Sequence, residues 1–223
     1  MHIEPGLVDG AKIGLSYATA VAAGGTAVHF LGQSLREHGV FSVVARAVLA
    51  TLGTFVFFEI LPHFPVGVSE VHLILGSTLF LVLGAGPAAL GLALGLLIQG
   101  LFFAPFDLPQ YGMNLTTLLV PLFAMTAIAK RIIAPGTAYV DLGYSQVLRL
   151  SLVYQGGVVA WVAFWAFYGQ GLAATSSVAT FGLAYMTVVL LEPLVDLAVL
   201  AGAKTVRNSA PRGLFTARLY AAA

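Results

Sequence analysis

Long apolar runs separated by short polar breaks dominate this chain. A helix needs about 20 mostly apolar residues to cross the hydrocarbon core of a bilayer. The stretch 71–104 is too long for one such helix and short for two, and the breaker Gly84-Ala85-Gly86-Pro87 divides it. The pattern therefore predicts seven spans, at about residues 12–32, 41–61, 71–84, 87–104, 113–130, 148–168 and 177–203.

The composition supports a membrane protein. Hydrophobic residues make up 59% of the 223 residues and charged residues only 9%, whereas roughly a quarter of a soluble domain is charged. We therefore expect an all-α polytopic bundle in the lipid bilayer, with residues 1–223 as a single transmembrane domain. The absence of cysteine excludes disulfides and thiolate metal sites. The net charge of +1, without a large basic patch, gives no reason to expect nucleic-acid binding.

The placement of Lys and Arg predicts the orientation. The predicted loops 62–70, 105–112 and 169–176 contain neither residue. Basic residues instead accumulate on the other side of a seven-span bundle: Arg36, Arg46, Lys130, Arg131, Arg149, Lys204, Arg207, Arg212 and Arg218. Because cytoplasmic loops carry the excess of Lys and Arg, the N-terminus is predicted outside and the C-terminus in the cytoplasm.

The opening "MHIEPG" carries the first candidate chemistry. Acidic residues and a proline stand where a signal peptide would be basic, so we expect segment 1–11 to be kept and folded into the outer mouth. The amine of Met1, the amide of His2 and Nδ1 of the His2 ring could bind one ion in two fused chelate rings. Only metals high in the Irving–Williams order readily displace an amide proton, which favours Cu(II), Ni(II) and Co(II).

A fourth nitrogen would have to come from another histidine. In the predicted topology His29 and His38 belong to the cytoplasmic side, which leaves His63 and His72. His72 is preferred because it stands at the start of the predicted short helix, at membrane depth, where a polar side chain needs a partner or a function. Taken alone, His72 also fits a hydrogen-bonded packing residue, and His63 a loop residue at headgroup level.

Two stretches resemble a known family. "MHIEPG" is similar to the opening of the CbiM/NikM-type substrate-binding membrane subunits of energy-coupling-factor transporters for cobalt or nickel. "LIQGLFFAPFDLPQYGMNLTTLLVPLF" follows the helix, outer loop, Gly-x-Asn and closing proline pattern of that family. The resemblance covers about residues 1–130.

The resemblance implies a square-planar site of four nitrogens, from Met1, His2 and His72, with Asn114 as a hydrogen-bonding residue behind the ligands. This chain has "VHLILGS" where the family usually has His-Pro-Thr-Gly, and "APFDLP" where it usually has His-Gly-Gly. These differences leave open the choice between Co(II) and Ni(II), and between His72 and His63.

Several acids could take part. Glu70, two residues before His72, is either an added oxygen ligand, an attracting charge or a solvated loop acid. Glu59, near the outer end of the second span, could join the site or reach water. Asp107 could attract cations or cap a turn.

Two further acids lie inside the last span. Glu192 and Asp196 are four residues apart, hence on one face of a helix, where like charges repel. We expect Arg149 or Lys130 to pair with them, or a partner protein to contact them.

The predicted function is that of the substrate-specific subunit of an energy-coupling-factor ABC transporter. The chain has no G-x-x-x-x-G-K-[ST] motif, so it is predicted to be no enzyme and to hydrolyse no ATP. By resemblance its partners are ATPase subunits, a coupling transmembrane subunit and a small accessory membrane subunit, in the plasma membrane of a prokaryote. It needs no cofactor, and the ion is its cargo. The alternatives are a stand-alone metal carrier or channel, and a subunit for a non-metal vitamin. An intramembrane enzyme is disfavoured because the histidines stand at predicted helix ends.

Overall fold

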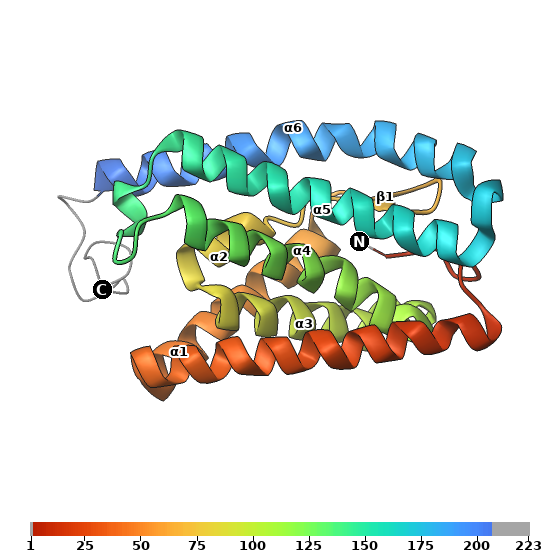
Figure 1. Ribbon diagram of the computed structural model, residues 1–223, viewed down its shortest axis with the longest axis horizontal. Helices are drawn as coiled ribbons and strands as arrows, with labels where there is room; N and C mark the ends of the chain where they lie inside the picture. Colours follow the sequence, from red (N-terminus) through yellow and green to blue (C-terminus); the bar gives the residue numbers. More distant parts are fainter. Residues whose placement is uncertain (1, 207–223) are drawn as a thin grey trace.

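Long helices lie side by side along the longest axis of the molecule (Figure 1). The computed structural model describes residues 2–206. In this part of the chain the α-helices are α1 (Gly14–Phe55), α2 (Gly76–Leu83), α3 (Ala85–Phe102), α4 (Tyr111–Ile132), α5 (Tyr144–Gln170) and α6 (Thr175–Val206). The prediction of an all-α bundle is confirmed.

Short elements connect these helices. The 3₁₀ turns are η1 (Gly10–Ile13), η3 (Pro105–Gln110), η4 (Tyr139–Asp141) and η5 (Gly171–Ala174), and η2 (Val56–Ile60) is a π-helical turn that extends α1. Two strands, β1 (Phe64–Val66) and β2 (Ser69–Val71), pair antiparallel. Their two-residue turn begins at Gly67, whose φ of +66° suits glycine at that position of a tight hairpin.

A sharp bend divides α1 into two antiparallel arms, seen at the lower left of Figure 1. The bend is at Gly39, where φ is +75° and ψ 166°, a conformation that only glycine adopts without strain. The two arms correspond to the predicted spans 12–32 and 41–61. The second arm ends at the π-helical turn, because Pro62 follows and cannot donate a backbone hydrogen bond.

The predicted break at 84–87 is present, but the short helix before it begins later than expected. Gly84, with φ +92°, separates α2 from α3. The prediction of a helix from residue 71 was wrong: residues 69–71 belong to β2, and α2 starts at Gly76. Strand pairing engages the backbone of this segment, so it is not available for helical hydrogen bonds. The eight residues of α2 extend only about 12 Å.

Four helical stretches among residues 2–206 are long and apolar enough to cross a membrane: Gly10–Ile60, Ala85–Phe102, Pro105–Ile132 and Tyr144–Val206. Bends and 3₁₀ turns lie within some of them. Large apolar side chains on their surfaces are exposed, including Phe41 at 94% and Leu172 at 86%, as expected for helices that face lipid. The chain is a multi-pass membrane protein, and the count of seven spans stays a prediction.

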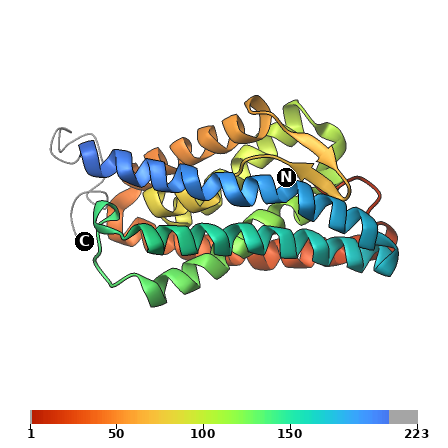
Figure 2. The same cartoon turned by 90° about the horizontal axis from the view of Figure 1, so that it is seen from above.

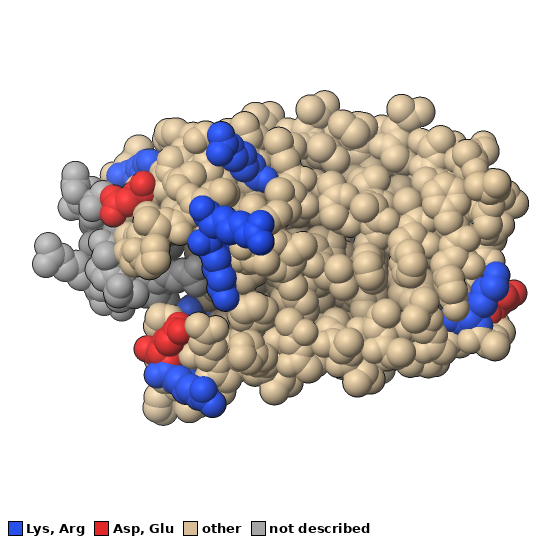
Figure 3. Space-filling view, in the orientation of Figure 1, with Lys and Arg blue, Asp and Glu red and all other residues tan. Residues whose placement is uncertain are grey.

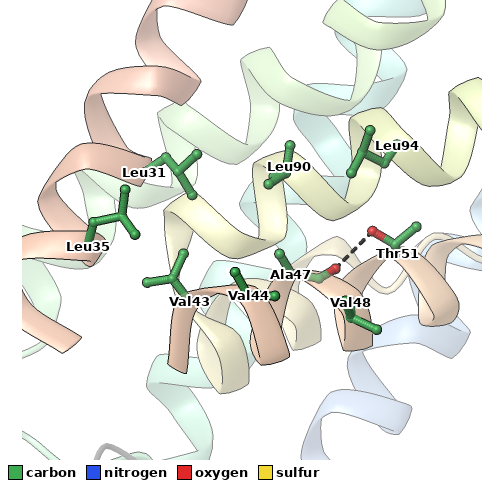
Figure 4. A pocket seen from close by; sticks show the side chains of 9 residues that line it. All are labelled: Leu31, Leu35, Val43, Val44, Ala47, Val48, Thr51, Leu90 and Leu94. Atoms are coloured by element: carbon green, nitrogen blue, oxygen red, sulfur yellow. Dashed lines mark hydrogen bonds between the residues drawn. The ribbon is translucent and has the colours of Figure 1, made fainter. Parts of the chain in front are cut away.

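An apolar groove lies on the surface between the two arms of α1 and α3 (Figure 4). Its volume is about 350 Å³, and leucine, valine, alanine and threonine side chains line it. A second cavity of about 740 Å³ lies where the first arm of α1 meets the end of α4, and includes Glu37 and Lys130. Neither cavity includes His2 or His72.

Candidate metal centre

The start of the chain is bound to the β-hairpin as a short third strand. Ile3 bridges Ser69 antiparallel. The carbonyl oxygen of His2 accepts from the Glu70 amide at 3.0 Å and from the Ser69 hydroxyl at 2.8 Å. Figure 2 shows this end of the chain beside the hairpin. Since β2 lies between β1 and the N-terminal segment, its backbone fixes the position of His2.

Asn114 holds the same segment from the opposite side. Its Oδ1 accepts a hydrogen bond of 2.8 Å from the Ile3 amide, and both residues are buried. Asn114 lies in the first turn of α4. The residue predicted to stand behind the ligands thus contacts the backbone directly next to His2.

The His2 ring is 3% exposed and faces two carboxylates. Its Nδ1 lies 2.6 Å from Oε2 of Glu70 and 3.9 Å from Oδ2 of Asp107. Its Nε2 has no hydrogen-bond partner among the described residues. The nitrogen that a chelate with the chain amine would use is therefore the one beside Glu70.

The His72 ring is 2% exposed and follows β2 directly. Its Nδ1 lies 3.1 Å from the carbonyl oxygen of Leu73. A carbonyl can only accept, so Nδ1 carries the proton and Nε2 has a free lone pair. Within residues 2–206, Nε2 has no hydrogen-bond partner. A buried imidazole with one nitrogen fixed by a carbonyl and the other free is the usual form of a metal-binding histidine.

These side chains converge. The centroids of the His2 and His72 rings are 6.1 Å apart, and the Phe58 ring packs edge-on against both. One potential ligand atom from each of His2, Glu70 and His72 lies within 4.8 Å of the other two. Ligand atoms on one transition-metal ion lie up to about 4 Å apart, so small side-chain rotations would suffice to bind one.

The electrostatics suit a cation. Burial lowers the pKa of His2, which favours the neutral ring. Burial raises the pKa of Glu70, but its hydrogen bond to His2 and the positive charge around it outweigh burial, and the net pKa lies below the usual value. A neutral imidazole beside an ionised carboxylate is ready to bind a metal, because metal ligands must be deprotonated.

The remaining predicted residues lie apart from this group or outside the description. His63 is half-buried, with Nδ1 3.2 Å from the Leu61 carbonyl oxygen, and it is not in the cluster. Glu59 is half-buried in the π-helical turn. Met1, Arg207, Arg212 and Arg218 lie outside the described residues.

Sequence reasoning missed Gln99 and Phe58. Gln99 is 2% exposed, its Nε2 donates to the Phe58 carbonyl at 3.4 Å, and its Oε1 has no partner among residues 2–206. Gln99 is the one strongly polar residue in the apolar helix α3, and a lone amide in a membrane helix signals a partner.

The expected ion pairs of Glu192 and Asp196 are absent from the described residues. Neither carboxylate meets Arg149 or Lys130; both accept hydrogen bonds from neutral donors on the chain that follows His72 and on α5. The prediction that Arg149 or Lys130 pairs with these carboxylates was wrong. Lys130 lies instead over the Phe30 ring, 5.7 Å from its centroid.

Comparison with protein families gives a match over residues 2–210 to the CbiM model, described as "Cobalt uptake substrate-specific transmembrane region". The chain belongs to this family. It is thus a membrane component for metal uptake and not an enzyme, and the resemblance seen in the sequence is confirmed.

Solved structures share the fold. A "Crystal Structure of an transition metal transporter" is similar with a TM-score of 0.71 and 17% identity, over 94% of this chain and 95% of that one. A "Crystal Structure of an Truncated Transition metal Transporter" has a TM-score of 0.64 and 15% identity, over 92% and 97%. Comparison with curated protein sequences gave no significant match.

Proposed function

We propose that this protein is the substrate-binding subunit of an energy-coupling-factor transporter and captures Co(II) or Ni(II) for import. The observation that carries the proposal is the convergence of two buried imidazoles and a carboxylate: one potential ligand atom from each of His2, Glu70 and His72 lies within 4.8 Å of the other two. Two such rings from segments 70 residues apart have no evident purpose as packing residues. The family membership supplies metal uptake as the context.

The proposed ligands are the Met1 amine, the His2 amide and Nδ1, and Nε2 of His72. Binding would replace the Nδ1 proton that His2 shares with Glu70. This set suits both Ni(II) and Co(II), which accept tetragonal nitrogen ligands. His63 is the alternative internal ligand, and its place outside the cluster disfavours it.

Glu70 is proposed to keep the bound ion neutralised. Its carboxylate lies 2.6 Å from the ligand nitrogen, so an ion bound there would also be close to its oxygen. Asp107 adds a second negative charge, 3.9 Å from the same nitrogen. Glu59, half-buried in the π-helical turn, has no contact that supports a role in the site.

The proposed partners are ATPase subunits, a coupling membrane subunit and a small accessory subunit in a prokaryotic plasma membrane. On the face drawn in Figure 3, Lys and Arg gather at the end of the bundle where α6 ends. By the positive-inside rule this end faces the cytoplasm, and energising subunits would act from that side.

The test is a calorimetric titration of the C-terminally tagged protein with NiCl₂ and CoCl₂, followed by visible absorption. Wild type and His63→Ala are expected to bind one ion with the same affinity, and His72→Ala to lose binding. Loss in His63→Ala with retention in His72→Ala would move the internal ligand to His63. Absence of binding in the wild type would overturn the proposal.

A further inference from the structure

Two buried carboxylates of α6 lie against the segment that carries His72. Glu192 is 0% exposed and Asp196 1%. Oε1 of Glu192 accepts from the backbone amide of Ile74, two residues after His72. The carboxylate of Asp196 accepts from the hydroxyls of Ser77, at 2.5 Å, and Thr78. One helix face thus binds residues 74–78 in two places.

This segment lacks support of its own. Leu75, with φ +52°, is the one non-glycine residue of the described chain in the left-handed region. It is also the N-cap position of α2 and gives no side-chain hydrogen bond to the helix. The first amides of a helix need acceptors, and negative charge near them is favourable. Glu192 accepts from the Ile74 amide, just before the Leu75 cap, and so places a carboxylate of another helix beside the start of α2.

A second layer fixes Glu192 itself. Its Oε2 accepts from the side-chain amide of Gln155 on α5, and Oε1 of Gln155 accepts from the Tyr185 hydroxyl at 2.7 Å. All three side chains are fully buried. Tyr154, the residue before Gln155, packs against Gly76, where a Cβ would lie 2.2 Å from the ring. Helices α5 and α6 thus hold the segment 74–76 together.

We propose that Glu192 is a positioning residue for metal capture: through the Ile74 amide it fixes the segment that places Nε2 of His72 opposite His2. This inference rests on the proposed function. Two buried carboxylates that have no Lys or Arg partner within residues 2–206 are costly at membrane depth, and a purely structural contact could be made by apolar side chains. A carboxylate is suited to this position because each oxygen faces a donor, Ile74 N–H on one side and Gln155 Nε2 on the other.

The test is Glu192→Gln, which keeps the shape of the side chain but turns one acceptor into a donor. Its matched control is Thr126→Val on α4, whose buried hydroxyl donates to the carbonyl of Leu122 in its own helix. Tyr185→Phe is the milder second variant, which removes the hydroxyl that orients Gln155. Each full-length protein is titrated with NiCl₂ and CoCl₂, and its metal spectrum is recorded.

Glu192→Gln is expected to weaken metal binding about tenfold and to shift the d–d band, as changes behind a metal ligand usually do. Tyr185→Phe is expected to change the metal affinity and the d–d band in the same direction, but by less. Thr126→Val is expected to leave the affinity and the band unchanged. In the metal-free protein, backbone amides of residues 72–78 exchange with deuterium faster in Glu192→Gln than in the control.

Unchanged affinity, spectrum and exchange in Glu192→Gln would overturn the inference while leaving the metal site intact. If Glu192→Gln does not fold, an unchanged affinity and spectrum in Tyr185→Phe overturns it. If the wild type binds no metal, the proposed function fails, and faster exchange in Glu192→Gln would still establish the anchoring of residues 72–78.

Discussion

Nδ1 of His2 lies 2.6 Å from Oε2 of Glu70, across the pairing of the N-terminal segment with β2. The same pairing bonds the Glu70 amide to the His2 carbonyl oxygen. Glu70 is therefore attached to His2 by both backbone and side chain. A charged acid is held next to the nitrogen that would bind the ion.

Glu70→Gln tests this charge. The amide keeps the size of the side chain and can still contact the ring, but it cannot neutralise a divalent ion. We expect the dissociation constants for Ni(II) and Co(II) to rise about tenfold with the protein still folded. Glu59→Gln is the control, since Glu59 is not in the cluster. Equal affinities in both variants and the wild type, measured by calorimetry, would mean that Glu70 only holds the backbone.

Asn114→Leu tests the anchoring of the N-terminal segment. The change removes the acceptor of the buried Ile3 amide. An unsatisfied buried donor costs about 1–3 kcal/mol, so the melting temperature should fall and limited proteolysis should cut the N-terminus faster. Asn114→Asp, which keeps an acceptor oxygen, should retain more stability. If both variants match the wild type, the Ile3 bond contributes nothing.

Gly76→Ala tests the close contact between the start of α2 and α5. A Cβ at Gly76 would lie 2.2 Å from Cζ of Tyr154, so the ring must move, at a cost of about 1–3 kcal/mol. Gly156→Ala is the matched control: nothing lies within 4 Å of its Cβ position, and alanine favours a helix over glycine by about 1 kcal/mol. Thermal unfolding in detergent should show the two changes moving in opposite directions. A stable Gly76→Ala protein would contradict this packing.

Gly39→Ala tests the bend of α1. There is space for a methyl group, but φ is +75°, so the strain falls on the backbone alone and should destabilise by about 1–2 kcal/mol. Gly25→Ala in the first arm, with equal space and no unusual φ, should not destabilise. The difference in melting temperature between the two variants is the readout. No difference would mean that residue 39 adopts another conformation.

The lengths of the apolar runs and the helix-breaking residues between them predicted much of the helix bundle. The divisions near Gly39 and at Gly84 could be predicted because glycine permits backbone conformations that end a helix. The hairpin could not be predicted from local pattern, since the apolar run from Val71 reads equally well as a helix or a strand. Its pairing with Ile3, far away in sequence, decided the outcome.

Part of the candidate site could also be identified from the sequence. His2 was a candidate from coordination chemistry and His72 from topology and resemblance, and the structure brings them together with Glu70. The surroundings of Glu192 and Asp196 were not predicted. Counting charges favours a basic partner, whereas the actual donors are an amide, two hydroxyls and a backbone N–H from distant segments.

The most direct test of the N-terminal site is two leucines inserted between Met1 and His2 in the C-terminally tagged protein, because a single inserted residue would make the histidine the third residue, where the amine, two amides and the ring bind Ni(II) in a square plane by themselves. The insertion leaves the helices unchanged but separates the chain amine from the His2 ring. The account predicts that wild type gives a visible d–d absorption band with NiCl₂, typical of square-planar nitrogen ligands, and that the insertion variant loses both band and binding. Equal binding and the same spectrum in the two proteins would contradict the N-terminal site.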